Sequence, residues 1–244
     1  MTHPILTHPR NNDIYYHPGS HTYWYQLETQ FDGITKWIKS YSQPFDAKNI
    51  SFAVARRDGR DQQDVLDEWD EKRDSAADYG NFVHDAIERW GNKQRRLKGQ
   101  KEYVDVVKKL LKEKGLTLVA VEFVVFDEET GRASPIDILC VNKEGKLVVV
   151  DVKTFEKGVQ WEGFKDARMR YPLYTLPDSN YYHASLQVGW YVKQLVERYG
   201  QQVETVGYIL HIRKYDDEIK ASLIQTDENA VEMINTLYKH EGDL

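Results

Sequence analysis

The spacing of apolar residues changes along the chain, from a helical repeat in the first half to short β-branched runs in the second. Apolar side chains recur every three or four residues in the helical stretches, and β-branched and aromatic residues cluster in the others. The predicted helices are 31–40, 61–73, 76–94, 100–114, 183–199 and 228–239, the last capped by Asp227. The predicted strands are 116–126, 136–141, 146–154, 203–213 and 219–225.

The order of these elements predicts the class of fold. Residues 1–28 are rich in His, Pro, Tyr and Asn, and we expect a loop there with one short strand at 23–27. Helices followed by three strands, a helix, two strands and a helix are typical of an α/β (α+β) architecture. We therefore predict a mixed central β-sheet flanked by helices, with a helical N-terminal region. We expect one domain over 1–244, with a mainly helical part at 1–115, a sheet core at 116–226 and a C-terminal helix at 227–244.

Composition narrows the class of protein. The chain has 244 residues, 33 Lys and Arg, 39 Asp and Glu, a formal net charge of −6 and 41% hydrophobic residues, which excludes a disordered chain. No apolar run approaches the roughly 18 residues of a membrane helix, and no signal peptide is recognisable. The single cysteine, Cys140, excludes a disulfide or a Cys-ligated zinc or iron–sulfur site within one chain. We expect a cytoplasmic protein.

An acidic hairpin is the most informative segment. The turn residues 142–145 separate two strands, and a turn with a glycine bulge there places 142 opposite 146 and Asp137 opposite Asp151. Strand alternation places Asp151 and Lys153 on one face and Val152 on the other. Like charges on facing positions destabilise a sheet, and a divalent cation bound by oxygen ligands removes that repulsion. The alternative is a solvated strand end with water between the two carboxylates.

Two helices flank this hairpin with polar residues four positions apart. Gly80, His84 and Glu88 share one helix face, where the glycine permits close approach of another backbone and His84 could ligate a metal. The alternative is an ordinary His84–Glu88 helix pair. Gln187 and Tyr191 share a face of the later helix, where they could contact a phosphate, support the acidic hairpin or simply pack at a helix–sheet junction.

Read together, these motifs resemble a known family. Over residues 80–191 the chain order is Gly-x-x-x-His-x-x-x-Glu, a glutamate in an apolar strand (Glu122), an aspartate (Asp137), Asp-x-Lys at 151–153 and Gln-x-x-x-Tyr at 187–191. This order resembles the RecB-like branch of the PD-(D/E)XK nuclease superfamily. The segments His21-Thr22-Tyr23 and 171–187 are similar to phage-encoded and mitochondrial RecB-like exonucleases.

The resemblance implies a restriction-endonuclease-like fold and a role for each matched residue. Mg²⁺ or Mn²⁺ would be held by the side chains of His84, Asp137 and Asp151 and by the carbonyl of Val152, and Lys153 would be the catalytic lysine. Glu122 matches an acidic family position whose role varies, and we carry it as a further catalytic candidate. The residues expected to support the site or contact DNA are Gln187, Tyr191 and Glu88.

Positive charge near the Gln187 helix would guide a DNA backbone. Arg168 and Arg170 are the candidates, and a merely solvated surface is the alternative. The chain departs from the family in having Ser134-Pro135-Ile136 before Asp137, where a glycine is common. It also lacks the four cysteines of the branch that carries an iron–sulfur cluster, so we expect no cluster.

The function implied is metal-dependent hydrolysis of DNA phosphodiester bonds, most simply by an exonuclease that leaves a 5′-phosphate and a 3′-hydroxyl. Its partners would be single-stranded or duplex DNA ends and phage or host proteins of recombination or replication, with no membrane. Three alternatives stay open. They are a non-catalytic nucleic-acid-binding module on the same fold, a structural or restriction-type endonuclease, and a protein whose carboxylates hold a structural cation while its helices form a partner surface.

Overall fold

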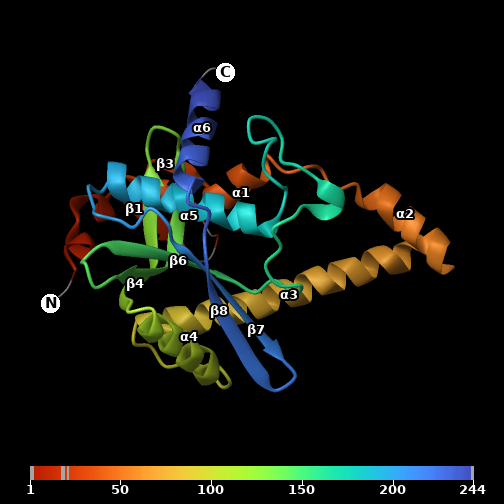
Figure 1. Cartoon of the computed structure of the whole chain (residues 1–244), viewed down its shortest axis with the longest axis horizontal. Coiled ribbons are helices and arrows are strands. Elements are labelled where there is room, and N and C mark those ends of the chain that lie inside the picture. The colour runs from red at the N-terminus through yellow and green to blue at the C-terminus, as the bar shows by residue number, and fades with distance from the viewer. Residues whose placement is uncertain (1–2, 18–19, 21, 243–244) are drawn as a thin grey trace.

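A mixed eight-stranded β-sheet lies between two layers of helices in the computed structural model, which describes residues 3–17, 20 and 22–242 (Figure 1). His21 of the N-terminal resemblance lies outside these residues. Strand β4 (Thr117–Asp127) pairs with β5 beside the main strand path. That path runs through β1 (Ile14–His17), β2 (Thr22–Tyr25), β3 (Thr29–Gly33), β5 (Arg132–Val141), β6 (Leu147–Lys153), β7 (Tyr208–Tyr215) and β8 (Glu218–Gln225).

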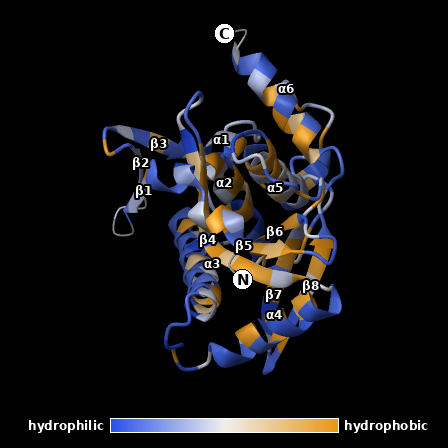
Figure 2. Cartoon of the chain, turned by 90° about the vertical axis from the view of Figure 1, so that its left-hand side faces the viewer, coloured by the Kyte–Doolittle hydropathy of each residue, from blue (hydrophilic) through white to orange (hydrophobic). Residues whose placement is uncertain are grey.

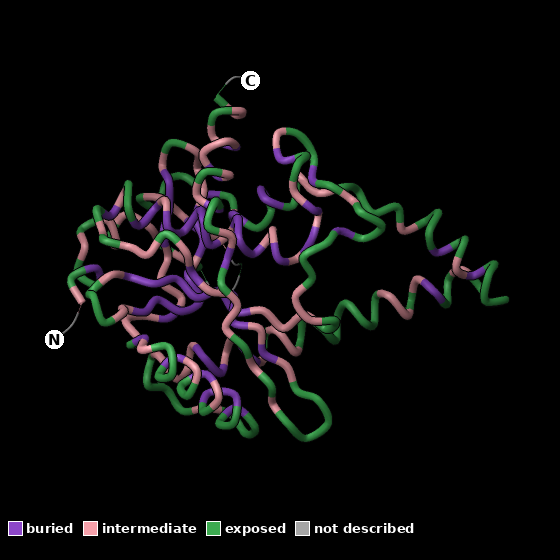
Figure 3. Tube along the Cα trace, in the orientation of Figure 1, coloured by how far each residue is buried: buried purple, intermediate pink, exposed green. Residues whose placement is uncertain are grey.

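The helices cover both faces of the sheet, which confirms the predicted mixed sheet flanked by helices (Figure 1). One face carries α3 (Gln62–Gly91) and α4 (Lys101–Glu113), and the other carries α1 (Ile34–Lys39), α5 (Asn180–Glu197) and α6 (Ala230–Gly242). Helix α2 (Ala47–Asp58) and the first half of α3 project from the body and are largely exposed (Figures 1 and 3). The short 3-10 helices are η1 (Pro4–Thr7), η2 (Pro9–Asn12) and η3 (Phe164–Asp166). Among the described residues, no helix has both the length and the apolarity to cross a bilayer.

Strand β6 shows why the middle of the chain reads as a nearly continuous apolar run. Val148, Val150 and Val152 pack in the cluster under α3 and α4, while Leu147 and Val149 pack in the cluster under α1, α5 and α6. A strand covered on both faces has no solvent face to make polar, so its sequence does not alternate. Figure 2 shows the resulting concentration of hydrophobic residues in the strands.

Three predictions about helices and strands were wrong. The region predicted as a loop with one strand at 23–27 contains β1 as well as β2. Strand β3 takes up the start of the helix predicted at 31–40, because its pairing with β2 and β5 delays the first helix until Ile34. The two helices predicted at 61–73 and 76–94 are the single helix α3, because no Gly or Pro separates them. Helix α2 was not predicted, since it buries only Ser51 and Ala55, although Asp46 caps its start and Gly59 ends it at φ 65°.

The hairpin register agrees with the prediction. Ile138 pairs with Val150, and the backbone N–H of Asn142 donates to the carbonyl of Lys146 at 2.9 Å. The same register continues to Asp137 and Asp151, but the paired ladder itself ends one residue earlier, at Ile138. The two aspartates therefore sit at the point where β5 and β6 separate.

This separation leaves a gap along one edge of β5. On that edge, β6 pairs with residues 138–141 and β3 pairs only with Arg132 and Ala133. Residues 134–137 lie between these two partners and belong to neither ladder, while β4 pairs along the opposite edge. Backbone groups facing the gap must find partners other than a strand, and this requirement shapes the site described below.

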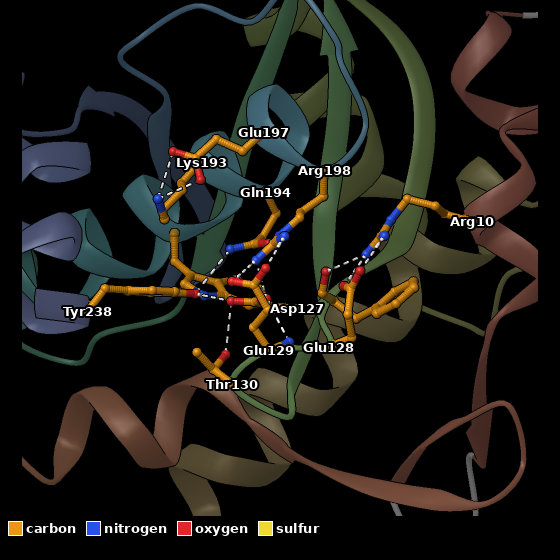
Figure 4. A network of polar contacts seen from close by, with 12 residues as sticks. Arg10, Asp127, Glu128, Glu129, Thr130, Lys193, Gln194, Glu197, Arg198 and Tyr238 are labelled. Carbon is orange, nitrogen blue, oxygen red and sulfur yellow. Dashed lines mark hydrogen bonds and ion pairs between the residues drawn. The ribbon is translucent and has the colours of Figure 1, made fainter. Parts of the chain in front are cut away.

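A polar network fastens the C-terminal helices to the sheet at the end of β4 (Figure 4). The carboxylate of Asp127 accepts hydrogen bonds from Arg198 Nη2 at 2.9 Å, from the Tyr238 hydroxyl at 2.7 Å and from the Thr130 hydroxyl at 3.0 Å. These bonds tie the end of β4 to α6 and to the residue after α5. The network thus fixes the position of α5, which in turn supports the gap.

Candidate active site

Asp137 occupies the gap in the sheet edge. Its Oδ2 accepts a hydrogen bond from the backbone N–H of Val152 at 2.6 Å, in place of a ladder bond. The flanking residues Ile136 and Ile138 pack on opposite faces of the sheet, whereas residues two apart in a regular strand share a face. The strand is therefore kinked at Asp137, which turns its side chain toward the gap rather than squarely onto one face.

Glu122 lies beside Asp137 on the neighbouring strand. Val121 pairs with Ile138 and Phe123 pairs with Ile136, so the register places Glu122 opposite Asp137. Its φ of 49° is in the left-handed region that residues other than glycine rarely adopt. Such strain costs about 1–3 kcal/mol and persists where the surrounding structure requires it, often at functional sites.

His84 completes a compact group of metal-ligating side chains. Its Nδ1 lies 3.5 Å from Asp137 Oδ1 and 3.9 Å from Glu122 Oε1, and the ligating atoms of the three residues lie within 4.8 Å of one another. Two adjacent ligands of one ion with bonds of about 2.1 Å lie roughly 3 Å apart, so small adjustments suffice for a shared ion. The imidazole of His84 therefore faces the carboxylates of the strands and does not form the alternative pair with Glu88.

Helix α3 comes close to the end of β6 at Gly80. A Cβ atom there would lie 3.3 Å from the hydroxyl oxygen of Thr154, a tighter contact than most side chains make. The sequence predicted close approach of another backbone at this glycine, and the neighbour found is a side-chain hydroxyl. This contact brings His84, one turn further along α3, over the gap.

Asp151 and Lys153 form the second half of the site. Lys153 Nζ lies 2.6 Å from Asp151 Oδ2 and 3.3 Å from the side-chain oxygen of Gln187. Both carboxylate oxygens of Asp151 are buried; Oδ2 is ion-paired with Lys153, and Oδ1 has no hydrogen-bond partner among the described residues. Asp151 stands outside the compact group of His84, Glu122 and Asp137. Its unpartnered Oδ1 is the donor type that a hard divalent cation binds, so the residues present fit such an ion.

The electrostatics of the site reflect charges crowded into a buried space. Burial, and then repulsion from Asp137, raises the pKa of Asp151 to about 6, although Lys153 opposes the rise. Burial also raises the pKa of Asp137. Burial alone would lower the pKa of His84, but the carboxylates of Asp137 and Glu122 outweigh it and raise that pKa to about 9. An excess of negative charge in a buried cluster is what a bound cation would relieve.

Tyr191 closes the gap from the α5 side. Its hydroxyl donates to the carbonyl of Pro135 at 2.7 Å, accepts from Gln187 Nε2 at 2.8 Å and lies 2.9 Å from the Ser134 hydroxyl. The side chain is 1% exposed. Of the roles left open for this pair, Tyr191 therefore supports the acidic hairpin, while Gln187 reaches Lys153.

Ser134 and Pro135 both form hydrogen bonds with the Tyr191 hydroxyl. Proline has no N–H to satisfy, and its carbonyl in the gap is bound by Tyr191 instead of by a strand. Ser134 joins the same cluster through its hydroxyl. Sequence reasoning did not assign Ser134 a role, and the departure from the family pattern at 134–136 was the signal that could have drawn attention to it.

The other predicted residues lie further from this centre. Glu88 is one turn beyond His84 on α3 and is half-buried. Arg168 and Arg170 are exposed on the segment between β6 and α5, where their guanidinium groups donate to the carbonyls of Thr175 and Ser40. Neither arginine contacts Lys153 or Gln187, and their role toward DNA stays a prediction.

Comparison with known proteins adds little information about the site. No protein-family model and no curated protein matches the chain. The chain is distantly similar in structure to a protein from Eubacterium rectale, solved at 2.19 Å and named "Putative exonuclease". The two are 12% identical, the match covers 83% of this chain and 67% of the other, and the TM-score is 0.35. A likeness this low carries no weight for function.

Proposed function

We propose that this protein is a Mg²⁺- or Mn²⁺-dependent DNA nuclease, an exonuclease of the RecB-like PD-(D/E)XK kind. The observation that carries the proposal is the buried Asp151 carboxylate, whose Oδ2 is ion-paired with Lys153 and whose Oδ1 has no hydrogen-bond partner among the described residues. The compact group of His84, Glu122 and Asp137 at the same gap supports it. The order of these residues along the chain is the order of the family motifs.

The proposed ion would be held by Asp137, Asp151, His84 and the backbone carbonyl of Val152. Glu122 belongs to the same compact group and would contribute a further oxygen or orient a ligand. Carboxylate oxygens suit Mg²⁺ and Mn²⁺, and an imidazole in the set is tolerated by Mn²⁺ in particular. An ion bound there supplies Lewis-acid stabilisation of the phosphate and a more acidic water.

Lys153 acts in this proposal as a positively charged donor and not as a general base. Burial would lower its pKa, but Asp151 and Asp137 outweigh burial and raise that pKa above 10.5. The ammonium group therefore stays protonated at neutral pH. It is held between Asp151 and Gln187, where it can orient the attacking water and donate to the phosphate as negative charge accumulates there.

The reaction is an in-line hydrolysis. The water oxygen forms a bond to phosphorus, the bond from phosphorus to the 3′-oxygen breaks, and the 3′-oxygen takes up a proton. The products are a 5′-phosphate and a 3′-hydroxyl. Tyr191 and Ser134 hold the Pro135 end of the gap and keep Asp137 in position while the charges change. Arg168 and Arg170 would guide the DNA backbone, and proteins of phage or host recombination or replication would deliver the ends.

The test is a time course on end-labelled single-stranded and duplex DNA with Mg²⁺ or Mn²⁺, beside the same reactions in EDTA. We expect metal-dependent shortening from an end, and a loss of several orders of magnitude in Lys153→Ala. The matched control is Lys109→Ala, an exposed lysine on α4 away from the gap, which should cut like wild type. Binding of DNA without cleavage would favour a non-catalytic module, and absence of both would overturn the proposal.

A further inference from the structure

A pocket of about 270 Å³ opens beside Lys153, on the side of β6 that faces α1 and α5. Its apolar walls come from Ile38 on α1, Ala184 on α5 and the ring of Phe155, two residues beyond Lys153. This volume is just below the roughly 300–1,000 Å³ of pockets that hold drug-sized ligands. The size and apolar lining suit a single flat ring system attached to the reacting group.

The charge of this pocket is opposite to that of the whole chain. Lys39 and Lys153 line it, and no aspartate or glutamate does, although the chain carries a net charge of −6. Lys39 is exposed and forms no ion pair within the part of the chain that the structure describes. A pocket with apolar walls and one unpaired ammonium group at its rim favours a ligand with an apolar body and negative charge.

The polar wall of the pocket is already fixed by other contacts. His183 Nε2 lies 2.7 Å from Asp178 Oδ1 and 3.1 Å from the Ser42 hydroxyl, which hold the imidazole in place. The Phe155 ring stacks at 18° on the ring of His211, with 6.4 Å between centroids. A preformed wall lowers the entropy cost of binding.

We propose that this pocket receives the nucleoside next to the scissile phosphate as an unpaired unit, with its base against Phe155 and a neighbouring phosphate at Lys39. The inference rests on the proposed function, because that function places the scissile phosphate at Lys153. Helices α1 and α5 bound the pocket, so a base can enter it only after leaving its complementary partner. Aromatic stacking on an unpaired base is worth about 1–3 kcal/mol. The substrate that fits is therefore a single-stranded DNA end.

The test measures binding, which does not depend on hydrolysis. The probe is a dye-labelled pentathymidylate with Ca²⁺ in place of Mg²⁺, read by fluorescence anisotropy, with an unlabelled duplex of the same end sequence as competitor. Thr35→Trp places a large side chain at the mouth of the pocket, and Lys36→Trp, its exposed neighbour on α1 outside the pocket, is the matched control. Phe155→Leu removes the aromatic wall and keeps its apolar character. Thermal unfolding of each variant checks that it folds.

We expect Thr35→Trp and Phe155→Leu each to weaken binding about tenfold, which corresponds to about 1.4 kcal/mol, and Lys36→Trp to bind within about twofold of wild type. The duplex should compete poorly. Wild-type affinity in folded Thr35→Trp, or equal competition by duplex, overturns the proposal. Pocket-dependent binding without any cleavage by wild type would sink the nuclease function but support the pocket. Cleavage unaffected by Thr35→Trp would support the nuclease function and overturn the proposed role of the pocket.

Discussion

Replacing Asp151 by asparagine should stabilise the protein without metal and remove its response to metal. The carboxylate has a pKa of about 6 in the folded state against 3.8 in the unfolded chain. At about 1.4 kcal/mol per pH unit, keeping it ionised costs the fold about 3 kcal/mol at neutral pH. Asparagine has the same shape and no charge, and Lys153 keeps its contact with Gln187. The pKa of about 6 already includes the attraction of Lys153. The buried amide N–H groups of asparagine reduce the gain, so we expect about 2 kcal/mol.

The sign of the effect fixes its pH dependence. Because the folded-state pKa is the higher one, the ionised carboxylate destabilises the fold above pH 6, and the penalty disappears below about pH 4. Urea unfolding of wild type and Asp151→Asn in EDTA should therefore give curves that coincide near pH 4 and separate as the pH rises to 7. Glu144→Gln, at an exposed position in the hairpin turn, is the control and should follow wild type.

Addition of Mn²⁺ reverses the order of stability. A ligand at 100 times its dissociation constant stabilises the folded state by about 2.7 kcal/mol, and we expect this gain for wild type and little of it for Asp151→Asn. The variant should thus be the more stable protein in EDTA and the less stable one in Mn²⁺. A variant that is less stable than wild type at pH 7 in EDTA, or that responds equally to Mn²⁺, would refute the reasoning.

Three further predictions concern the metal, the gap and the Asp127 network. Binding of Mn²⁺ must displace a proton from His84, whose pKa is about 9. The affinity for Mn²⁺ should therefore rise with pH from 6 to 8, with release of about one proton. Calorimetry in two buffers of different ionisation enthalpy measures the number of protons released, and zero release at pH 7 contradicts the prediction. Tyr191→Phe leaves the Pro135 carbonyl without its donor and should cost about 1–3 kcal/mol in urea unfolding, whereas no loss would mean that water replaces the hydroxyl. Asp127→Ala removes a buried carboxylate with three donors and should cost at least about 3 kcal/mol, and a loss below about 1 kcal/mol would deny the network its anchoring role.

The local parts of the candidate site followed from the sequence. The hairpin register depended on the turn at 142–145, and turn geometry is a short-range property. The i, i+4 spacings that put His84 after Gly80 and Tyr191 after Gln187 on common helix faces are likewise set by the helix repeat alone. The strand at β6 itself followed from its β-branched, apolar-rich run.

The long-range parts could not be read in this way. The gap along β5 exists because β3, a strand from the N-terminal region, pairs beside β6 on the same edge. No strand is predicted at 29–33 from the sequence, where residues 31–33 are assigned to a helix, so unpaired backbone at 134–137 was not expected. Glu122 takes its place in the compact group through a left-handed φ, which strand alternation does not predict.

The sequence by itself determined which chemical groups are available and which of them share a helix face or a hairpin, since those relations depend on neighbours a few residues apart. Only the tertiary structure decided that Tyr191 supports Pro135 instead of facing a substrate, that Asp151 lies with Lys153 outside the group around Asp137, and that a cationic pocket adjoins Lys153. Each of these depends on how α1, α3 and α5 pack across the sheet. That packing is fixed by burial and by hydrogen bonds between segments far apart in the chain.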